Sequence, residues 1–166
     1  MTFAYVGLGS NLGHPRRQLA SAVRALRRLP RSRLVAVSPS YVTAPLGSAA
    51  HQPDYVNAVA VLATSLAPGA LLKRLLAIER RHRRTRTQRN APRTLDLDLL
   101  LFGRRCMRSD DLSIPHPRMH VRAFVLRPLA DVAPAVQIPG RGAVQLLLRD
   151  VANQRVARTR NHRLDR

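Results

Sequence analysis

The sequence contains few acidic residues: 9 Asp and Glu stand against 29 Lys and Arg among 166 residues, which gives a formal net charge of +20. Lys73 is the only lysine, and no acid occurs before Asp54. This balance is compatible with an anionic partner, either nucleotide phosphates or nucleic acid. Because the arginines are spread along the chain, a general preference for surface Arg explains most of them. That preference does not explain the shortage of acids.

Further cysteines, membrane-spanning runs and a leader pattern are also missing. Cys106 is the only cysteine, so no disulfide can form within the chain, and a reducing cytoplasm is expected. No apolar run approaches the roughly 20 residues that cross a bilayer. The first residues, MTFAYVGLGSNLG, lack the basic start and the long apolar stretch of a signal peptide. We therefore expect a cytoplasmic protein with no membrane partner.

Aromatic residues are scarce, since the chain has no Trp, 3 Phe and 3 Tyr. Sheets that recognise RNA need stacking aromatics on their exposed face, so nucleic acid is not the expected partner. Tyr55 and Phe124 each flank a polar segment, where they could sandwich one planar ligand. Taken alone, each of them is explained more simply as a core residue.

Hydrophobic residues make up 45% of the chain, which suffices for one domain with a core. Strand patterns occupy 3–9, 33–38, 56–66 and the LDLDLLLF run from Leu95; helical patterns follow Pro15 and Pro68, and shorter ones cover 123–134 and 143–151. The order strand-helix-strand-strand-helix-strand is typical of ferredoxin-like α+β folds. We predict a mostly antiparallel sheet flanked by helices, in a single domain over 1–154. The basic C-terminal tail 155–166 is expected to be frayed.

The run RTLDLDLLLFG (93–103) places two of the few acids, Asp96 and Asp98, inside the most apolar stretch of the chain. Side chains alternate along a strand, so both aspartates share a face with Leu100 and Phe102, and the odd-numbered leucines form a core face. Their Cα atoms would lie about 6–7 Å apart, which lets the carboxylates converge on two metal ions. Without Cys or His beside them, oxygen ligands favour Mg²⁺. Neutralisation of the pair by arginines such as Arg93 fits the spacing equally well.

The segment RRHRRTRTQRNAPR (80–93) holds seven arginines and no large aliphatic residue, so we expect a mobile, cationic loop. Guanidinium groups bind phosphate oxygens in pairs, and the candidates are Arg84, Arg86, Arg89 and Arg93. A solvated charge run is the simpler reading of this segment by itself. Its position before the aspartates changes the balance, because acids for Mg²⁺ beside arginines for phosphate are typical of phosphoryl transfer.

His116 stands between two prolines in IPHPRMHVR, and Arg118 and Arg122 follow it. The prolines restrict its backbone, but a lone His is more often structural than ligand-binding. The glycines of GLGSNLG (7–13) have the wrong spacing for a dinucleotide fingerprint, and no GxxxxGK[ST] phosphate loop occurs. We expect these glycines to permit a tight turn between a strand and a helix.

Several motifs occur together and in order: GLGSNLG (7–13), PLG (45–47), QPDYVNAV (52–59), APRTLDLDLLLFG (91–103), IPHPRM (114–119) and RAFVLRPLADVAP (122–134). This set resembles the 6-hydroxymethyl-7,8-dihydropterin pyrophosphokinase family of the folate pathway, and the resemblance covers most of the chain. It implies a ferredoxin-like three-layer α/β sandwich. It also implies Mg-dependent transfer of a pyrophosphoryl group from ATP to the hydroxymethyl oxygen of the pterin, with release of AMP.

The resemblance also implies a role for each matching residue. Asp96 and Asp98 match the ligands of two Mg²⁺ ions, and catalytic roles extend to Arg84 and Arg93. Contacts with ATP are implied for Arg84, Arg86, Arg93, His116 and Arg122. The pterin is implied to stack between Tyr55 and Phe124, while its edge is read by Asn57 and by the backbone around Thr43, Ala44, Pro45 and Leu46.

Two positions depart from the family pattern. Asn90 stands where the family usually carries Trp, and Leu76 replaces a polar helix residue that helps to hold ATP in some relatives. The expected partners are ATP and 6-hydroxymethyl-7,8-dihydropterin, and the expected state is a monomer. Two alternatives stay open: a basic nucleic-acid-binding α/β module without catalysis, and a different Mg²⁺-dependent nucleotidyl- or phosphotransferase. Formation of AMP or ADP from ATP would separate the enzymes.

Overall fold

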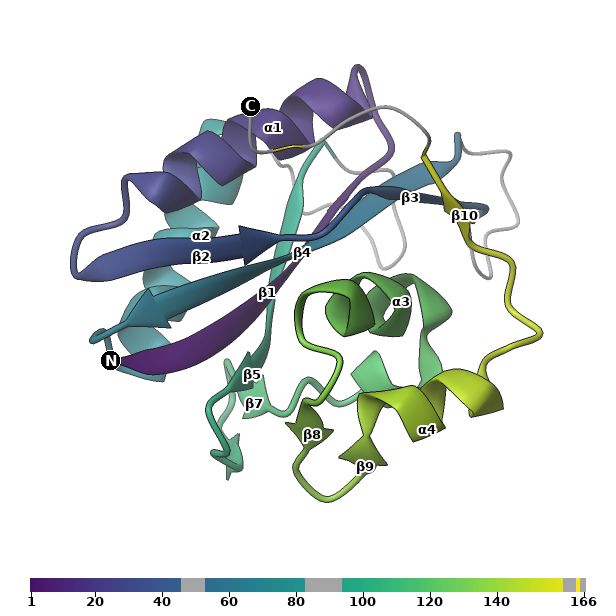
Figure 1. Ribbon diagram of the computed structural model, residues 1–166. Helices are drawn as coiled ribbons and strands as arrows, with labels where there is room; N and C mark the ends of the chain where they lie inside the picture. The colour runs from purple at the N-terminus through teal and green to yellow at the C-terminus, as the bar shows by residue number, and fades with distance from the viewer. Residues whose placement is uncertain (46–52, 83–93, 160–163, 165–166) are drawn as a thin grey trace.

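The structure is a computed structural model that describes residues 1–45, 53–82, 94–159 and 164. Within these residues, six strands form one antiparallel sheet (Figure 1): β1 (Thr2–Ser10), β2 (Ser32–Val37), β3 (Tyr41–Thr43), β4 (Tyr55–Thr64), β5 (Asp96–Phe102) and β10 (Ala157–Arg158). The strand order is β10-β3-β4-β1-β5. Strand β2 pairs with the second half of β4, and β3 pairs with the first half.

Helices cover both faces of this sheet (Figure 1). They are α1 (Pro15–Arg27) and α2 (Pro68–Arg81) on one face, and α3 (Ala123–Val132) and α4 (Val144–Asp150) on the other. Each face has its own apolar cluster: Leu26 and Leu75 belong to the first, and Leu126 and Leu148 to the second. The predicted three-layer α+β sandwich with a ferredoxin-like, mostly antiparallel sheet is therefore confirmed.

The two long helices begin at the prolines that the sequence indicated. Pro15 and Pro68 occupy the first turn of their helices. Amide groups in that turn make no hydrogen bond within the helix, so the missing N–H of proline costs nothing there. In α1, the buried side chains follow helical spacing, and Arg24 and Arg27 lie in the last turn, where the helix dipole favours positive charge. None of the helices in the described ranges is long and apolar enough to span a bilayer.

Short elements complete the described chain. They are β6 (Met107–Arg108), β7 (Ser113–Ile114), a 3-10 turn at Met119–Val121, β8 (Gln137–Ile138) and β9 (Gly142–Ala143). Strands β6 and β7 form one small hairpin, and β8 and β9 form another.

The strict alternation predicted for β5 holds through Leu100 and is wrong for Leu101 and Phe102. The pairing with β1 shifts by one residue, so that Tyr5 and Val6 oppose Leu101 and Leu99 and leave Leu100 as an extra residue. A β-bulge of this kind reverses the faces of the side chains that follow it. Leu101 consequently joins Leu100 in the cluster under α3, while Phe102 joins the cluster under α1 and α2.

The prediction of a frayed tail from residue 155 on is wrong for its first part. Ala157 and Arg158 pair with Val42 and Tyr41 of β3, and the Thr159 amide donates to the Ser40 carbonyl at 3.0 Å. Leu164 is 4% exposed and belongs to the first apolar cluster. The basic composition hid these contacts, because a two-residue edge strand is held by backbone hydrogen bonds instead of an apolar pattern.

Candidate functional site

The two predicted metal-binding carboxylates lie at the start of β5. Asp98 is opposite Gly7 of β1, and Asp96 is opposite Gly9. Because glycine has no side chain, β1 leaves space beside Asp96, where a Cβ atom at Gly9 would lie 4.0 Å from Cβ of Asp96. At Gly7, the Leu100 side chain lies 3.4 Å from the place that a Cβ atom would take. The expectation that these glycines form a turn is therefore wrong for Gly7 and Gly9, and only Gly13 has the left-handed backbone (φ 64°) of a turn glycine.

A row of side chains crosses four strands beside this space. Tyr41, Asn57, Gly9 and Asp96 are paired in turn through β3, β4, β1 and β5, and directly paired residues project from the same face. That face is covered by α3, because the Tyr41 hydroxyl donates to Asp131 of α3 at 2.6 Å. The predicted pterin-reading and metal-binding residues thus lie on one face of the sheet.

The predicted pterin contacts come from β3, β4 and α3. The buried amide of Asn57 donates to the buried Thr43 hydroxyl at 3.0 Å, and Tyr55 is paired with Thr43 across the two strands. Ala44 and Pro45 follow directly after β3. Phe124 stands in the first turn of α3 and is half-buried.

Arg122 precedes α3 and lies over the ring of Phe124, with its guanidinium carbon 5.4 Å from the ring centroid. This is a cation–π distance. The side chain predicted for ATP and the side chain predicted for the pterin are therefore in contact.

His116 is held against the bulge of β5, since its backbone amide donates to the Leu100 carbonyl at 2.9 Å. Burial lowers the pKa of His116 to about 4, with help from the positive charges of Arg122 and Arg118, while Asp96 opposes the shift. The imidazole is therefore neutral at pH 7. Its Nδ1 accepts the Arg118 amide at 3.2 Å, so the proton resides on Nε2, which can donate to an anionic oxygen.

The residues around Asp96 and Asp98 fit Mg²⁺. The donors are hard carboxylate oxygens, which this ion prefers, and Gly9 leaves room beside Asp96. Within the described residues, no group of three or more His, Cys, Asp or Glu could hold a metal ion. Two carboxylates, with no third such ligand in the part of the chain that the structure describes, match an ion that completes its shell with water and substrate phosphates.

Several predicted site residues cannot be placed, because Leu46, Arg84, Arg86 and Arg93 lie outside the described residues. Sequence reasoning also missed two residues at the end of β1. Ser10 donates its hydroxyl to the Thr94 carbonyl at 2.6 Å, and the Asn11 amide donates to the Pro53 carbonyl at 3.2 Å. Small polar residues directly after a strand, within GLGSNLG, were the available signal.

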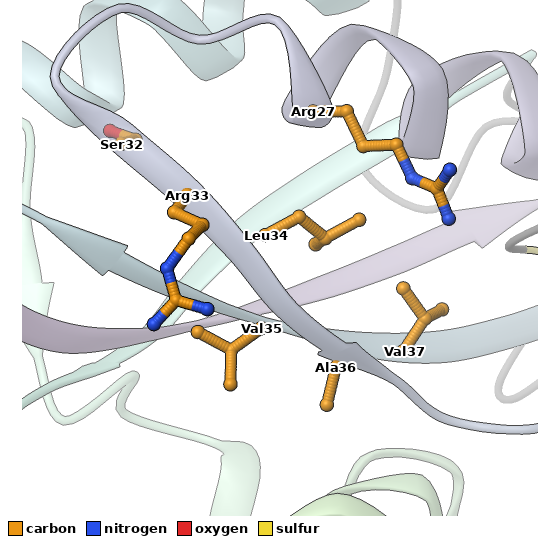
Figure 2. A pocket seen from close by; sticks show the side chains of 7 residues that line it. All are labelled: Arg27, Ser32, Arg33, Leu34, Val35, Ala36 and Val37. Atoms are coloured by element: carbon orange, nitrogen blue, oxygen red, sulfur yellow. The ribbon is translucent and has the colours of Figure 1, made fainter.

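A separate pocket lies at the opposite edge of the sheet. It is lined by residues of β2, including Arg33, Leu34 and Val35, together with Arg27 at the end of α1 (Figure 2). Strand β2 pairs with β4, whereas the carboxylates are on β5, two strands farther along the sheet. This pocket is therefore not part of the site around Asp96 and Asp98.

Comparison with known proteins now adds to the geometry. Residues 5–134 match the family model described as 7,8-dihydro-6-hydroxymethylpterin-pyrophosphokinase (HPPK). The chain belongs to the HPPK family. One relative, the 2-amino-4-hydroxy-6-hydroxymethyldihydropteridine pyrophosphokinase of Pseudomonas aeruginosa, is 54% identical over 144 residues, which cover 86% of this chain and 88% of the relative. The protein of the same name from Haemophilus influenzae is 42% identical over 94% of this chain and 97% of its own length.

Solved structures support the HPPK fold. A triple mutant of the Plasmodium falciparum HPPK-DHPS protein with STZ-DHP matches at a TM-score of 0.72 and 13% identity, over 92% of this chain. The wild-type protein with pteroate matches at the same TM-score and 12% identity, also over 92% of this chain. This chain spans only 43% and 44% of those two chains, so the likeness concerns the HPPK fold alone.

Proposed function

We propose that this protein transfers the pyrophosphoryl group of ATP to 6-hydroxymethyl-7,8-dihydropterin in folate biosynthesis, releasing AMP. The hydroxymethyl oxygen forms a bond to the β-phosphorus. The bond from that phosphorus to the oxygen bridging to the α-phosphate breaks, and its electron pair leaves with AMP; the hydroxyl proton passes to water. The observation that carries the proposal is the pair Asp96 and Asp98 beside Gly9 and Asn57 on one sheet face.

Asp96 and Asp98 are proposed to hold two Mg²⁺ ions. Bound there, Mg²⁺ would neutralise and align the phosphate oxygens of ATP. The two carboxylates orient the nucleotide indirectly, by fixing where its phosphates can lie. Spacing on one strand, with glycines opposite, supports this role.

Positive and neutral donors are proposed to complete phosphate binding. His116 donates from Nε2, and Arg122 lies close enough for its charge to lower the pKa of His116. The family resemblance adds Arg84, Arg86 and Arg93, with catalytic roles for Arg84 and Arg93. Charge stabilisation by such fixed donors supplies much of the acceleration in phosphoryl transfer.

The pterin is proposed to stack on Tyr55 and Phe124. Asn57, oriented by Thr43, reads its edge together with the backbone of Ala44, Pro45 and Leu46. We propose that the hydroxymethyl group points toward β5, where the carboxylates lie. Binding both substrates on one rigid sheet face is the main source of catalysis by proximity.

The proposal extends to the state of the protein: a monomer in the cytoplasm, without a nucleic-acid partner. The single Cys106 supports the cytoplasmic location, and the scarcity of aromatic residues argues against a nucleic-acid partner. Binding of RNA that is tight, falls steeply with salt and is not displaced by Mg-ATP and pterin would contradict the last point.

The deciding experiment is incubation with ATP, Mg²⁺ and 6-hydroxymethyl-7,8-dihydropterin, followed by mass analysis. Equal amounts of AMP and the pterin diphosphate are expected. Formation of ADP and a pterin monophosphate would instead show transfer of a single phosphoryl group, and hydrolysis of ATP without a pterin product would overturn the assignment of the acceptor.

A further inference from the structure

Glu79 is an acidic residue of α2 that faces the sheet instead of solvent. It is 2% exposed, although Glu is seldom buried to this extent without partners. It follows Leu75 by four residues and Leu71 by eight, so it continues the apolar stripe of the helix. A buried carboxylate needs hydrogen-bond donors. Because α2 packs on β5, that strand can supply a donor to Glu79.

The contact that Glu79 makes there is with the backbone between the two aspartates. Its Oε1 accepts the amide of Leu97 at 2.7 Å, in a buried hydrogen bond. Among the described strands, β5 is at the edge of the sheet and pairs with β1 on one side. Glu79 therefore takes the place that a further strand would occupy for Leu97. A buried amide without such an acceptor would be costly.

A second hydrogen bond, which is partly buried, holds the same segment two residues before Asp96. The hydroxyl of Ser10, which is 0% exposed, donates to the Thr94 carbonyl at 2.6 Å. Asp96 thus lies between Thr94, whose carbonyl is held by Ser10, and Leu97, whose amide is held by Glu79. Rotation of the Leu97 peptide would turn both neighbouring carboxylates away from their common space.

We propose that Glu79 is a positioning residue of the metal site: through the Leu97 amide it sets the orientation of Asp96 and Asp98. This inference rests on the proposed function, because it assumes that these two carboxylates bind Mg²⁺. Residues that orient metal ligands in this way change metal affinity about 10–100-fold when they are replaced. The proposed role depends on an acceptor that reaches the Leu97 amide.

Two conservative variants separate the effect of the length of the Glu79 side chain from the effect of its charge. Glu79→Gln keeps the length and a carbonyl acceptor but removes the charge. Glu79→Asp keeps the charge but is shorter by one methylene, so it falls short of the Leu97 amide. The probe is Mn²⁺ in place of Mg²⁺, and its affinity is measured by electron paramagnetic resonance with a non-hydrolysable ATP analogue and without turnover.

We expect Glu79→Gln to bind Mn²⁺ within about threefold of the wild type and Glu79→Asp to bind it about tenfold more weakly. Wild-type affinity in Glu79→Asp would overturn the proposal, and so would a loss in Glu79→Gln as large as that in Glu79→Asp. If Glu79→Asp does not fold, hydrogen exchange of the Leu97 amide in Glu79→Gln decides: slow exchange supports the proposal, and fast exchange with unchanged Mn²⁺ affinity overturns it.

Two controls complete the test. Ile78→Val perturbs the same helix and core without touching the Leu97 amide, so it should lower the melting temperature while leaving Mn²⁺ affinity unchanged. Asp98→Asn tests the proposed function itself. If Asp98→Asn binds Mn²⁺ normally, the metal site is misassigned; if it loses Mn²⁺ while Glu79→Asp does not, only the role of Glu79 is wrong.

Discussion

A Cβ atom placed on Gly9 would stand 3.2 Å from Oδ1 of Asn57. That distance is shorter than an ordinary van der Waals contact, and the Asn57 amide is already committed to Thr43. A methyl group at residue 9 must therefore displace the side chain that we propose reads the pterin. The position of the Asn57 side chain on β4 therefore requires glycine at residue 9 of β1.

Gly9→Ala is predicted to raise KM for the pterin about tenfold, with a smaller effect on KM for ATP, because it displaces Asn57 more than the carboxylates. Steady-state kinetics with each substrate varied measures this. Gly7→Ala is the matched control, since its new methyl group would meet the Leu100 side chain at an ordinary 3.4 Å. Equal changes in KM for the pterin in both variants would contradict the prediction.

Asp98→Asn is predicted to lower turnover about a thousandfold or more, because it keeps the side-chain volume but removes a charged oxygen ligand. Pyrophosphoryl transfer is followed at saturating ATP, pterin and Mg²⁺, and thermal unfolding checks that the fold is retained. The exposed Asp110 provides a control, for which Asp110→Asn should leave turnover near the wild-type value. Turnover of Asp98→Asn within tenfold of wild type would argue against the metal site.

His116 is predicted to make stability depend on pH in acid. Its pKa of about 4 in the folded protein lies below the roughly 6.5 of an unfolded chain. Between these values only the unfolded chain binds the proton, so the contribution is complete above pH 6.5 and is lost as the pH falls toward 4. Denaturant unfolding of the metal-free protein should show a loss of about 2 kcal/mol across this window, after allowance for screening by solvent.

The variant His116→Gln cannot titrate, so it should lack that part of the pH dependence. The same unfolding experiment, repeated from pH 7 to pH 4, provides the comparison. An unchanged slope in His116→Gln would mean that the imidazole is not held neutral in the folded protein.

Tyr41→Phe is predicted to lower the free energy of unfolding at pH 7 by about 1 kcal/mol, because it removes the hydrogen bond to Asp131 that joins β3 to α3. Burial, the hydrogen bond and the charge of Asp131 raise the pKa of Tyr41 to about 12. Its contribution is therefore complete below about pH 10, the unfolded value, and is lost as the pH rises toward 12.

Denaturant unfolding at pH 7 and between pH 10 and 12 measures both effects of Tyr41. Asp131→Asn keeps an acceptor and removes the charge, so it should retain more stability at pH 7 than Tyr41→Phe does. If Tyr41→Phe were as stable as wild type at pH 7, the hydrogen bond would contribute nothing net to the packing of α3.

Much of the fold could be predicted from local patterns in the sequence. Pro15 and Pro68 mark the starts of α1 and α2 because their missing amides are tolerated only in the first turn. The apolar run of β4 was equally clear. The bulge at Leu100 could not be predicted, because nothing in a run of leucines shows where two residues will oppose one. The pairing of β10 with β3 joins residues far apart in the sequence and depends on backbone groups alone.

The site was predictable to the extent that its chemistry is unusual for its surroundings. Two acids in a leucine-rich strand stand out, and the structure puts them on the same sheet face as Asn57. The positions of Gly7 and Gly9 opposite the aspartates were missed, because the sequence does not show the register in which β1 and β5 pair. Glu79 was hidden by its arginine-rich neighbours, although its spacing from Leu75 already put it on the buried stripe of α2.

The anchoring by Ser10 and Asn11 has a consequence for how the enzyme can evolve. These two neighbours hold Thr94, just before the metal-binding strand, and Pro53, just before the strand that carries Tyr55 and Asn57. A substitution at either position would disturb a dipeptide that supports both the proposed metal-binding strand and the proposed pterin-binding strand. Substitutions at Ser10 or Asn11 should therefore change the affinity for both substrates. Variants adapted to new inhibitors or metabolite levels should carry their substitutions at other positions.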